Sequence, residues 1–179
     1  MTTNTCPQML IRIESLARQL RFPLDTEEEG FSLRVRAVSF RVRFPYSTTL
    51  NRIARTVPNA LWIKADREWS WPLEHYAAAR AARDQIIQTQ RALWEARESL
   101  VSEIFFDNPN ATIRSASARN VGCIVGKNEF LVAQKNGASL FVLHEIAALS
   151  STVTVGETRS ISYFSGHGVV MPIGEGELG

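Results

Sequence analysis

Arginine is the residue type whose placement in this chain points most clearly to chemistry. Residues 31–67 carry eight basic side chains and one acidic one, a local surplus of seven charges in a chain whose formal net charge is +2. The basic side chains are Arg34, Arg36, Arg41, Arg43, Arg52, Arg55, Lys64 and Arg67. A guanidinium presents a planar fork of donors to phosphate oxygens and also stacks on bases. The pattern favours contact with nucleic acid, DNA above RNA, and leaves open an acidic protein surface or simple solvation.

Residue types that carry catalysis or bind metals lack the spacing that these chemistries require. His75, His144 and His167 lie far apart, and none occurs in a metal-ligand pattern such as HExxH. We expect His144 to end a strand and bond the backbone, and His167 to lie in a glycine turn. The sequence has no GxxxxGK[ST] phosphate loop and no serine marked as a nucleophile. We therefore expect no catalytic centre, no metal and no cofactor.

The composition indicates a globular chain of one compact domain or two small ones, and we favour two. The chain has 179 residues, of which 45% are hydrophobic, which is enough to bury a sizeable core. Cys6 and Cys123 resemble neither a disulfide framework nor a metal knuckle. No window approaches about 18 uninterrupted apolar residues, and the first residues lack a basic segment before an apolar run. The sequence predicts a cytoplasmic protein that does not engage a membrane.

Alternation of apolar and basic residues predicts how four of the arginines are positioned. Apolar residues alternate with arginines within 31–36 and again within 40–44, a period of two that is typical of strands. A turn near Ala37 to Ser39 would join the two strands in a hairpin. Because successive side chains on a strand point to opposite faces, the apolar residues would face the core and all four arginines would share the exposed face.

Helical spacing and turn residues predict the elements around this hairpin. We expect residues 7–20 to form an amphipathic helix and the acidic segment 25–29 to be a solvated linker. Residues 47–57 form a short helix with Arg52 and Arg55 on its polar side.

A second hairpin is predicted from Leu61–Lys64 and Glu68–Trp71. Trp69 and Trp71 share one face of their strand, so both are in the core or both are exposed, and we favour the core.

A long helix is predicted from Pro72 to Phe106, since this stretch has no glycine or internal proline. Apolar residues recur along it at intervals of seven. With their neighbours, they are Ile86, Ile87, Leu93, Trp94, Leu100 and Val101. This seam either packs on its own domain, the interpretation that we favour, or joins a homodimer or a partner helix.

The C-terminal part predicts a small antiparallel barrel or roll, so that the whole chain is α+β. We divide the chain into a module of residues 1–106, a linker of 107–121, a β domain of 122–172 and a flexible tail of 173–179. The expected strands cover 122–125, 129–134, 139–144, 158–163 and 168–171.

The segment 40–76 resembles the HARP domain of annealing helicases. The resemblance rests on Phe44, Pro45 and Tyr46, on Val57, Pro58, Ala60 and Trp62, and on Trp69, Pro72 and Leu73. It implies engagement of DNA at junctions between single and double strands, without chemistry of its own.

The segment 122–170 resembles the KfrB domain of plasmid-encoded proteins. The motif positions are Gly122, Ile124, Val125 and Gly126; Leu131, Val132 and Gln134; Val142, His144 and Leu149; and Val155, Gly156, Ile161 and Tyr163. The resemblance implies residence on a plasmid, integrated element or phage, with an accessory role in maintenance or transfer.

These patterns together predict a non-catalytic nucleic-acid-binding accessory protein of a mobile element, which contacts DNA phosphates through the arginine face. The alternative is a mobile-element inhibitor of a host defence complex, an anti-CRISPR or anti-restriction protein that acts by protein contact. In that case the arginines would meet an acidic surface of a host nucleic-acid-processing complex, and the long helix or the β domain would provide the apolar anchor.

Overall fold

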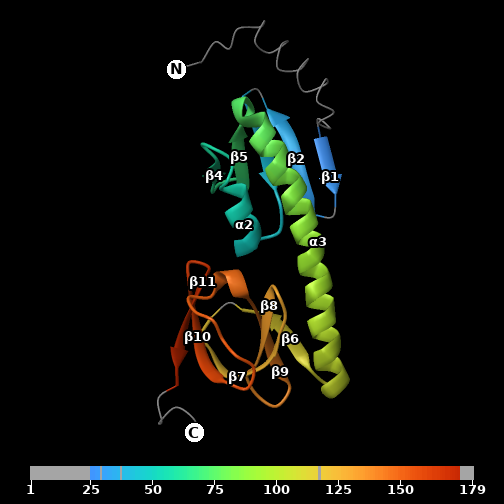
Figure 1. The fold of residues 1–179 in the computed structure, drawn as a ribbon, viewed down its shortest axis with the longest axis vertical. Coiled ribbons are helices and arrows are strands. Elements are labelled where there is room, and N and C mark those ends of the chain that lie inside the picture. The colour runs from blue at the N-terminus through green and yellow to red at the C-terminus, as the bar shows by residue number, and fades with distance from the viewer. Residues whose placement is uncertain (1–24, 29, 37, 117, 174–179) are drawn as a thin grey trace, which may run out of the picture. The chain divides into compact units, whose positions relative to one another are not determined.

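The computed structural model describes residues 25–173 apart from Glu29, Ala37 and Ser117 (Figure 1). The helix predicted at 7–20 and the tail after residue 173 lie outside the described residues. The chain divides into two compact units. The first runs to Tyr46 and continues with Leu50–Ile87, and the second comprises Ser47–Thr49 and the chain from Gln88 onward. The division falls within the long helix, and the predicted α+β fold class is confirmed.

The first unit contains a five-stranded antiparallel sheet in the order β1-β2-β3-β5-β4. The strands are β1 (Asp25–Glu28), β2 (Phe31–Arg36), β3 (Ser39–Arg43), β4 (Leu61–Ile63) and β5 (Glu68–Pro72). Both predicted hairpins are confirmed. Strand β1 corrects the prediction of a linker at 25–29, since its backbone pairs with β2 and places Asp25 opposite Arg34. An edge strand needs backbone hydrogen bonds along one side only, and an acidic composition does not reveal them.

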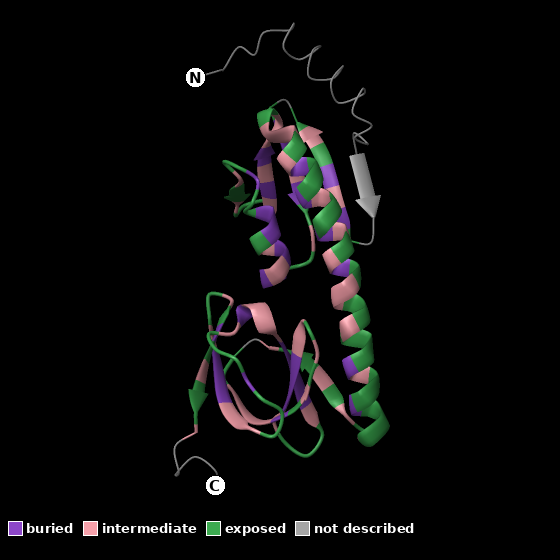
Figure 2. Cartoon of the chain, in the orientation of Figure 1, coloured by how far each residue is buried: buried purple, intermediate pink, exposed green. Residues whose placement is uncertain are grey.

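The three central strands β2, β3 and β5 bury one face of this sheet. Its register aligns Leu33 of β2 with Val42 of β3 and Trp69 of β5, and all three side chains are buried. Trp71 is also completely buried, so the tryptophans of β5 belong to the core, as predicted. Figure 2 shows buried residues at alternate positions along these strands.

Two helices supply buried residues to the first unit. Helix α2 (Thr48–Ala54) buries Leu50, Ile53 and Ala54. The Trp69 indole N–H donates a hydrogen bond of 3.0 Å to Asn51 of this helix, so α2 lies on the tryptophan face of the sheet. After a 3-10 turn (η1, Leu73–His75), helix α3 (Tyr76–Asp107) adds Ala79, Ala82 and Ile86 to the buried residues of this unit. The predicted long helix is therefore confirmed.

The second unit contains a six-stranded sheet in the order β11-β10-β7-β8-β9-β6. The strands are β6 (Thr112–Ser115), β7 (Asn120–Lys127), β8 (Leu131–Lys135), β9 (Leu140–Glu145), β10 (Thr158–Phe164) and β11 (His167–Pro172). The five predicted strands are confirmed. Strand β6 lies in the segment predicted as a linker and pairs with β9 in parallel. Among the described strands no pairing joins β11 to β6, so closure into a barrel is not confirmed.

The core of the second unit has two parts. Leu100 and Ile104 of α3 pack with Ala133, Phe141 and Leu143. In the second part, buried residues of β7, β8 and β10 pack with Val153. Val153 lies in the loop after the 3-10 turn η2 (Ile146–Ala148).

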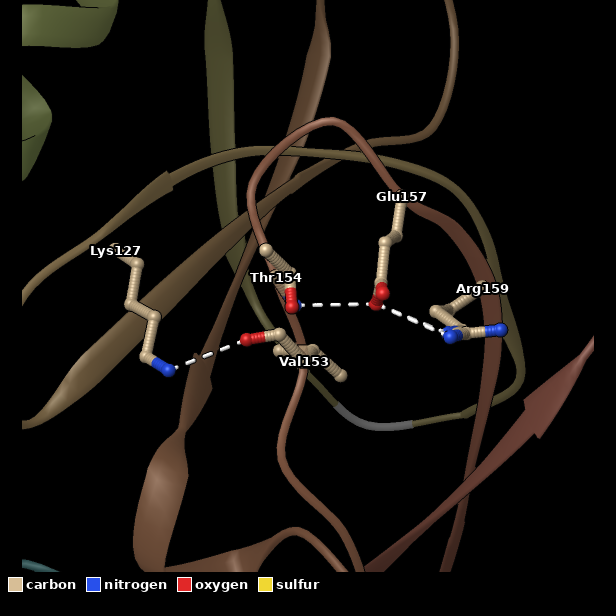
Figure 3. A network of polar contacts seen from close by, with 5 residues as sticks. All are labelled: Lys127, Val153, Thr154, Glu157 and Arg159. Carbon is tan, nitrogen blue, oxygen red and sulfur yellow. Dashed lines mark hydrogen bonds and ion pairs between the residues drawn. The ribbon is translucent and has the colours of Figure 1, made fainter.

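Polar contacts fix this loop over the core (Figure 3). The Lys127 ammonium donates to the carbonyl oxygen of Val153 at 3.1 Å. The Glu157 carboxylate accepts from the Thr154 amide at 3.1 Å and pairs with Arg159 at 3.1 Å. The Thr154 hydrogen bond, followed by the charge of Arg159, lowers the pKa of Glu157. These contacts hold the loop at Val153 and Thr154.

Among the described helices, none combines the length and the apolar character needed to cross a membrane.

Glycine at position 122 is required by the approach of strands β7 and β8. A Cβ atom added to Gly122 would overlap the backbone carbonyl oxygen of Lys135, whereas one added to Gly137 would meet nothing within 4 Å. We expect Gly122→Ala to lower the free energy of unfolding by about 3 kcal/mol or more, because backbone atoms must move apart. Gly137→Ala should change it by less than about 0.5 kcal/mol. Urea unfolding, with hydrogen exchange of the β7 and β8 amides, measures both effects, and equal losses would contradict the prediction.

Candidate functional site

The structure places the four strand arginines together on the face of the first sheet that lies opposite the core. Arg34 of β2 pairs directly with Arg41 of β3, and Arg36 and Arg43 follow two residues later on the same strands. Arg34, Arg36 and Arg43 are exposed, whereas Arg41 is half-buried. Since directly paired residues share a face, all four guanidinium groups start from one surface.

The turn between β4 and β5 makes this surface concave. The Arg43 guanidinium donates a hydrogen bond of 2.8 Å to the carbonyl oxygen of Asp66 and lies 3.7 Å from the Glu68 carboxylate. Arg43 therefore holds the turn on the arginine side of the sheet. The result is an open hollow of about 810 Å³, which we call the arginine hollow. Its lining residues are Arg34, Arg36, Arg41, Arg43, Ala65, Asp66, Arg67 and Glu68.

The lining of the arginine hollow is strongly cationic, with five arginines against two carboxylates. Arg43 is already engaged by Asp66 and Glu68. In the part of the chain that the structure describes, the buried Nη1 atom of Arg41 has no hydrogen-bond partner. Guanidinium groups gathered in this way can bind several phosphate oxygens through charge-assisted hydrogen bonds.

Three of the eight predicted basic residues lie outside the arginine hollow. Arg52 and Arg55 belong to α2 or directly follow it, and the Arg55 guanidinium lies 5.9 Å from the Trp69 ring centroid. Arg55 is therefore on the tryptophan face, opposite the strand arginines. Lys64 is exposed and does not line the hollow. Arg67 does line it, with a backbone φ of 54° that turns the chain sharply.

Sequence reasoning missed Asp66 and Glu68 as parts of the site. Glu68 is separated from Arg43 by 25 positions in the chain, so no local pattern connects them. The predicted hairpin of β4 and β5 was the signal that could have located Glu68. Where β5 pairs with β3, extending the register by one residue beyond Val42 and Trp69 places Glu68 beside Arg43.

Trp62, which is partly exposed, does not lie on the face of the strand arginines. Trp62 pairs with Trp69 in the sheet register and its ring centroid lies 5.5 Å from that of Trp69. Although 48% of Trp62 is exposed, it belongs to the tryptophan face. The arginine hollow therefore presents charge and hydrogen bonds rather than stacking surfaces.

The predicted helix seam is split between the two units. Ile86 is buried in the first unit, and Leu100 is buried in the second against Ala133 and Phe141. Ile87, Leu93 and Val101 are half-buried, and Trp94 is 41% exposed. These burials favour packing of the helix on its own chain. A seam with another helix would have to use Trp94 rather than Ile86 or Leu100.

A buried polar network connects four strands of the second unit, β7, β8, β9 and β10. His144 of β9 has one ring nitrogen 3.0 Å from the Gln134 side-chain oxygen and the other 3.0 Å from the Tyr163 hydroxyl. The Gln134 amide group donates to the carbonyl oxygens of Gly122 and Arg159, at 3.1 and 2.7 Å. The expectation that His144 bonds the backbone is thus wrong, because its strand neighbours present side-chain partners. His167 begins strand β11 and is exposed.

The donors and acceptors of this network follow from its geometry. The Gln134 nitrogen is used by two carbonyl groups, so its oxygen must accept from the Nε2–H of His144. Burial lowers the pKa of His144 to about 4, so the ring is neutral near pH 7 and Nδ1 accepts from the Tyr163 hydroxyl. Burial, followed by the charge of Glu145, raises the pKa of Tyr163 to about 12. Both groups keep one protonation state at neutral pH, which suits a structural link between strands.

Comparison with known proteins identifies one domain. Residues 119–172, less than a third of the chain, match the family model of the KfrB Domain. This range includes Gly122 and the whole Gln134–His144–Tyr163 network. No curated protein matches the chain, and no solved structure does. The HARP-like resemblance of residues 40–76 stays a prediction.

The buried imidazole makes stability depend on pH in a defined window. Because the pKa of His144 is lower in the folded protein than the value of about 6.5 in an unfolded chain, the unfolded state binds the proton more readily. His144 should cost no stability above about pH 6.5 and up to about 3 kcal/mol by about pH 4. NMR titration of the imidazole resonances, with exposed His167 for comparison, measures the pKa directly. A value for His144 near 6.5 would contradict the assignment.

Proposed function

We propose that this chain is a non-catalytic nucleic-acid-binding accessory protein of a plasmid or other mobile element, and that the arginine hollow holds DNA phosphates. The observation that carries the proposal is the convergence of five arginines from β2, β3 and the β4–β5 turn on one open hollow. A concave group of guanidiniums is a stronger phosphate ligand than the same charges spread over a surface.

The composition of the hollow favours contact with the nucleic-acid backbone over the bases. Its lining has arginine, alanine, aspartate and glutamate, and no aromatic side chain. Arginine contacts to phosphates position a nucleic acid without reading its sequence. We therefore expect weak dependence on base sequence and strong dependence on salt.

The second unit supports the mobile-element part of the proposal. Residues 119–172 match the KfrB Domain, and the resemblance of this segment to plasmid-encoded proteins implies an accessory role on such an element. The HARP-like resemblance adds a preference for junctions between single and double strands. We propose both as features of one DNA-associated protein.

The proposal is tested by removing two exposed arginines from the hollow. Arg34→Gln/Arg36→Gln should weaken binding to labelled DNA about tenfold or more at about 50 mM salt, because two phosphate contacts are lost. The slope of log affinity against log salt should fall by about two, since each contact contributes about 0.9 on duplex DNA. Fluorescence anisotropy between about 50 and 200 mM salt measures both quantities.

A matched control removes two exposed arginines of α3. Arg80→Gln/Arg97→Gln makes the same change in net charge away from the arginine hollow and should leave affinity nearly unchanged. Equal losses from both double variants would show a non-specific charge effect. Absence of DNA binding by the unmodified chain would overturn the proposal and direct attention to an acidic protein partner.

The HARP-like resemblance makes a separate prediction about DNA structure. Forked DNA should bind more tightly than single-stranded or duplex DNA of the same length, and the preference should depend on Arg34 and Arg36. Competition of unlabelled forked, single-stranded and duplex DNA against one labelled probe measures it. Equal competition by the three would remove the junction preference and leave backbone binding intact.

A further inference from the structure

Arg41 occupies the centre of the arginine hollow. The sheet register places it directly opposite Arg34 on β2 and Ser70 on β5. Arg41 is half-buried, and its Nη1 atom is buried without a hydrogen-bond partner in the described part of the chain. Its position differs from that of Arg43, whose guanidinium is held by the β4–β5 turn.

A buried charged donor without a partner is unfavourable in a folded protein. Such a group has lost water and has gained no hydrogen bond in return. Here the cost is increased by the neighbouring positive charge of Arg34, the cross-strand partner of Arg41. An anion bound at this point would provide acceptor oxygens for Nη1 and would reduce the repulsion between the guanidiniums.

We propose that Arg41, together with Arg34 and Arg36, forms a subsite for one phosphomonoester group, such as the terminal phosphate of a nucleic-acid strand. This inference rests on the proposed function and specifies the ligand of the same hollow. Three guanidiniums not engaged by the turn face this subsite, so a ligand with more than one negative charge fits it best.

The charge and oxygen count of a phosphomonoester match this arrangement. A phosphomonoester carries about 1.5 to 2 negative charges at neutral pH and three acceptor oxygens. An internal phosphodiester carries a single charge and has sugars on both sides. Asp66 and Glu68 on the turn side of the hollow would repel a further phosphate, which favours a strand that ends at the subsite over one that continues past it.

The test compares strands that differ only at their ends. Single-stranded DNA of one sequence is prepared with a 5′-phosphate, with a 3′-phosphate, with neither, and as a closed circle, and binding is measured at about 50 mM salt. We expect a phosphorylated end to bind about tenfold more tightly than the unphosphorylated or circular strand. Arg41→Lys, which keeps the charge but loses the planar fork, should abolish this difference. Arg80→Gln should preserve it.

A second measurement needs no nucleic acid. Inorganic phosphate at constant ionic strength should raise the thermal midpoint of the first unit, because a ligand that binds only the folded state stabilises it. The midpoint is monitored by the fluorescence of Trp62, Trp69 and Trp71 in a Trp94→Phe background, since Trp94 lies in the second unit. The increase should be absent in Arg41→Lys. Arg34→Gln, an exposed position, should reduce it and serves as the second variant should Arg41→Lys fold poorly.

The outcomes separate the two proposals. Equal, salt-sensitive binding of all four strands that still depends on Arg34 and Arg36 would overturn the terminal-phosphate subsite and leave the proposed function standing. Failure of every strand to bind would overturn both. A preference for phosphorylated ends that persists in Arg41→Lys would reject Arg41 as the ligand-binding residue.

Discussion

The two-residue alternation of strands β2 and β3 is the constraint on which the candidate site depends. Leu33, Val42 and Trp69 must be buried together, since leaving large apolar side chains in water is costly. Burial of that face directs every intervening residue outward. The arginines therefore lie together on the opposite face of the sheet. Burial of the apolar face thus holds the positive charges close to one another.

The gathered guanidiniums repel one another, and the described residues offset this repulsion only in part. Arg43 is compensated by the Asp66 carbonyl and by Glu68, and in this way it shapes the β4–β5 turn. The Nη1 atom of Arg41, by contrast, is buried without a hydrogen-bond partner among the described residues. A hollow in which Arg43 holds the turn and the Arg41 Nη1 atom has no hydrogen bond from the described residues is the basis of the anion site that we propose.

The second unit follows a different principle, the hydrogen bonding of the buried side chains Gln134 and His144. Gln134 connects to two backbone carbonyls and to His144, and His144 connects in turn to Tyr163. The network spans β7, β8, β9 and β10, so it fixes their relative register within the sheet. This gives a structural reason for the polar residues in the segment that matches the KfrB Domain. They form an internal link rather than a reactive centre.

The sequence by itself determined the elements whose signals are local. Alternation identified β2 and β3 and placed their arginines on one face, and periodicity identified α3 and the five strands from β7 to β11. Edge strands β1 and β6 escaped detection because they are stabilised by backbone pairing, and β6 pairs with the distant strand β9. Only the tertiary structure placed Arg52 and Arg55 outside the arginine hollow, joined Arg43 to Glu68 and left the Arg41 Nη1 atom without a hydrogen bond from the described residues. These features depend on contacts between residues far apart in the chain, which no local pattern records.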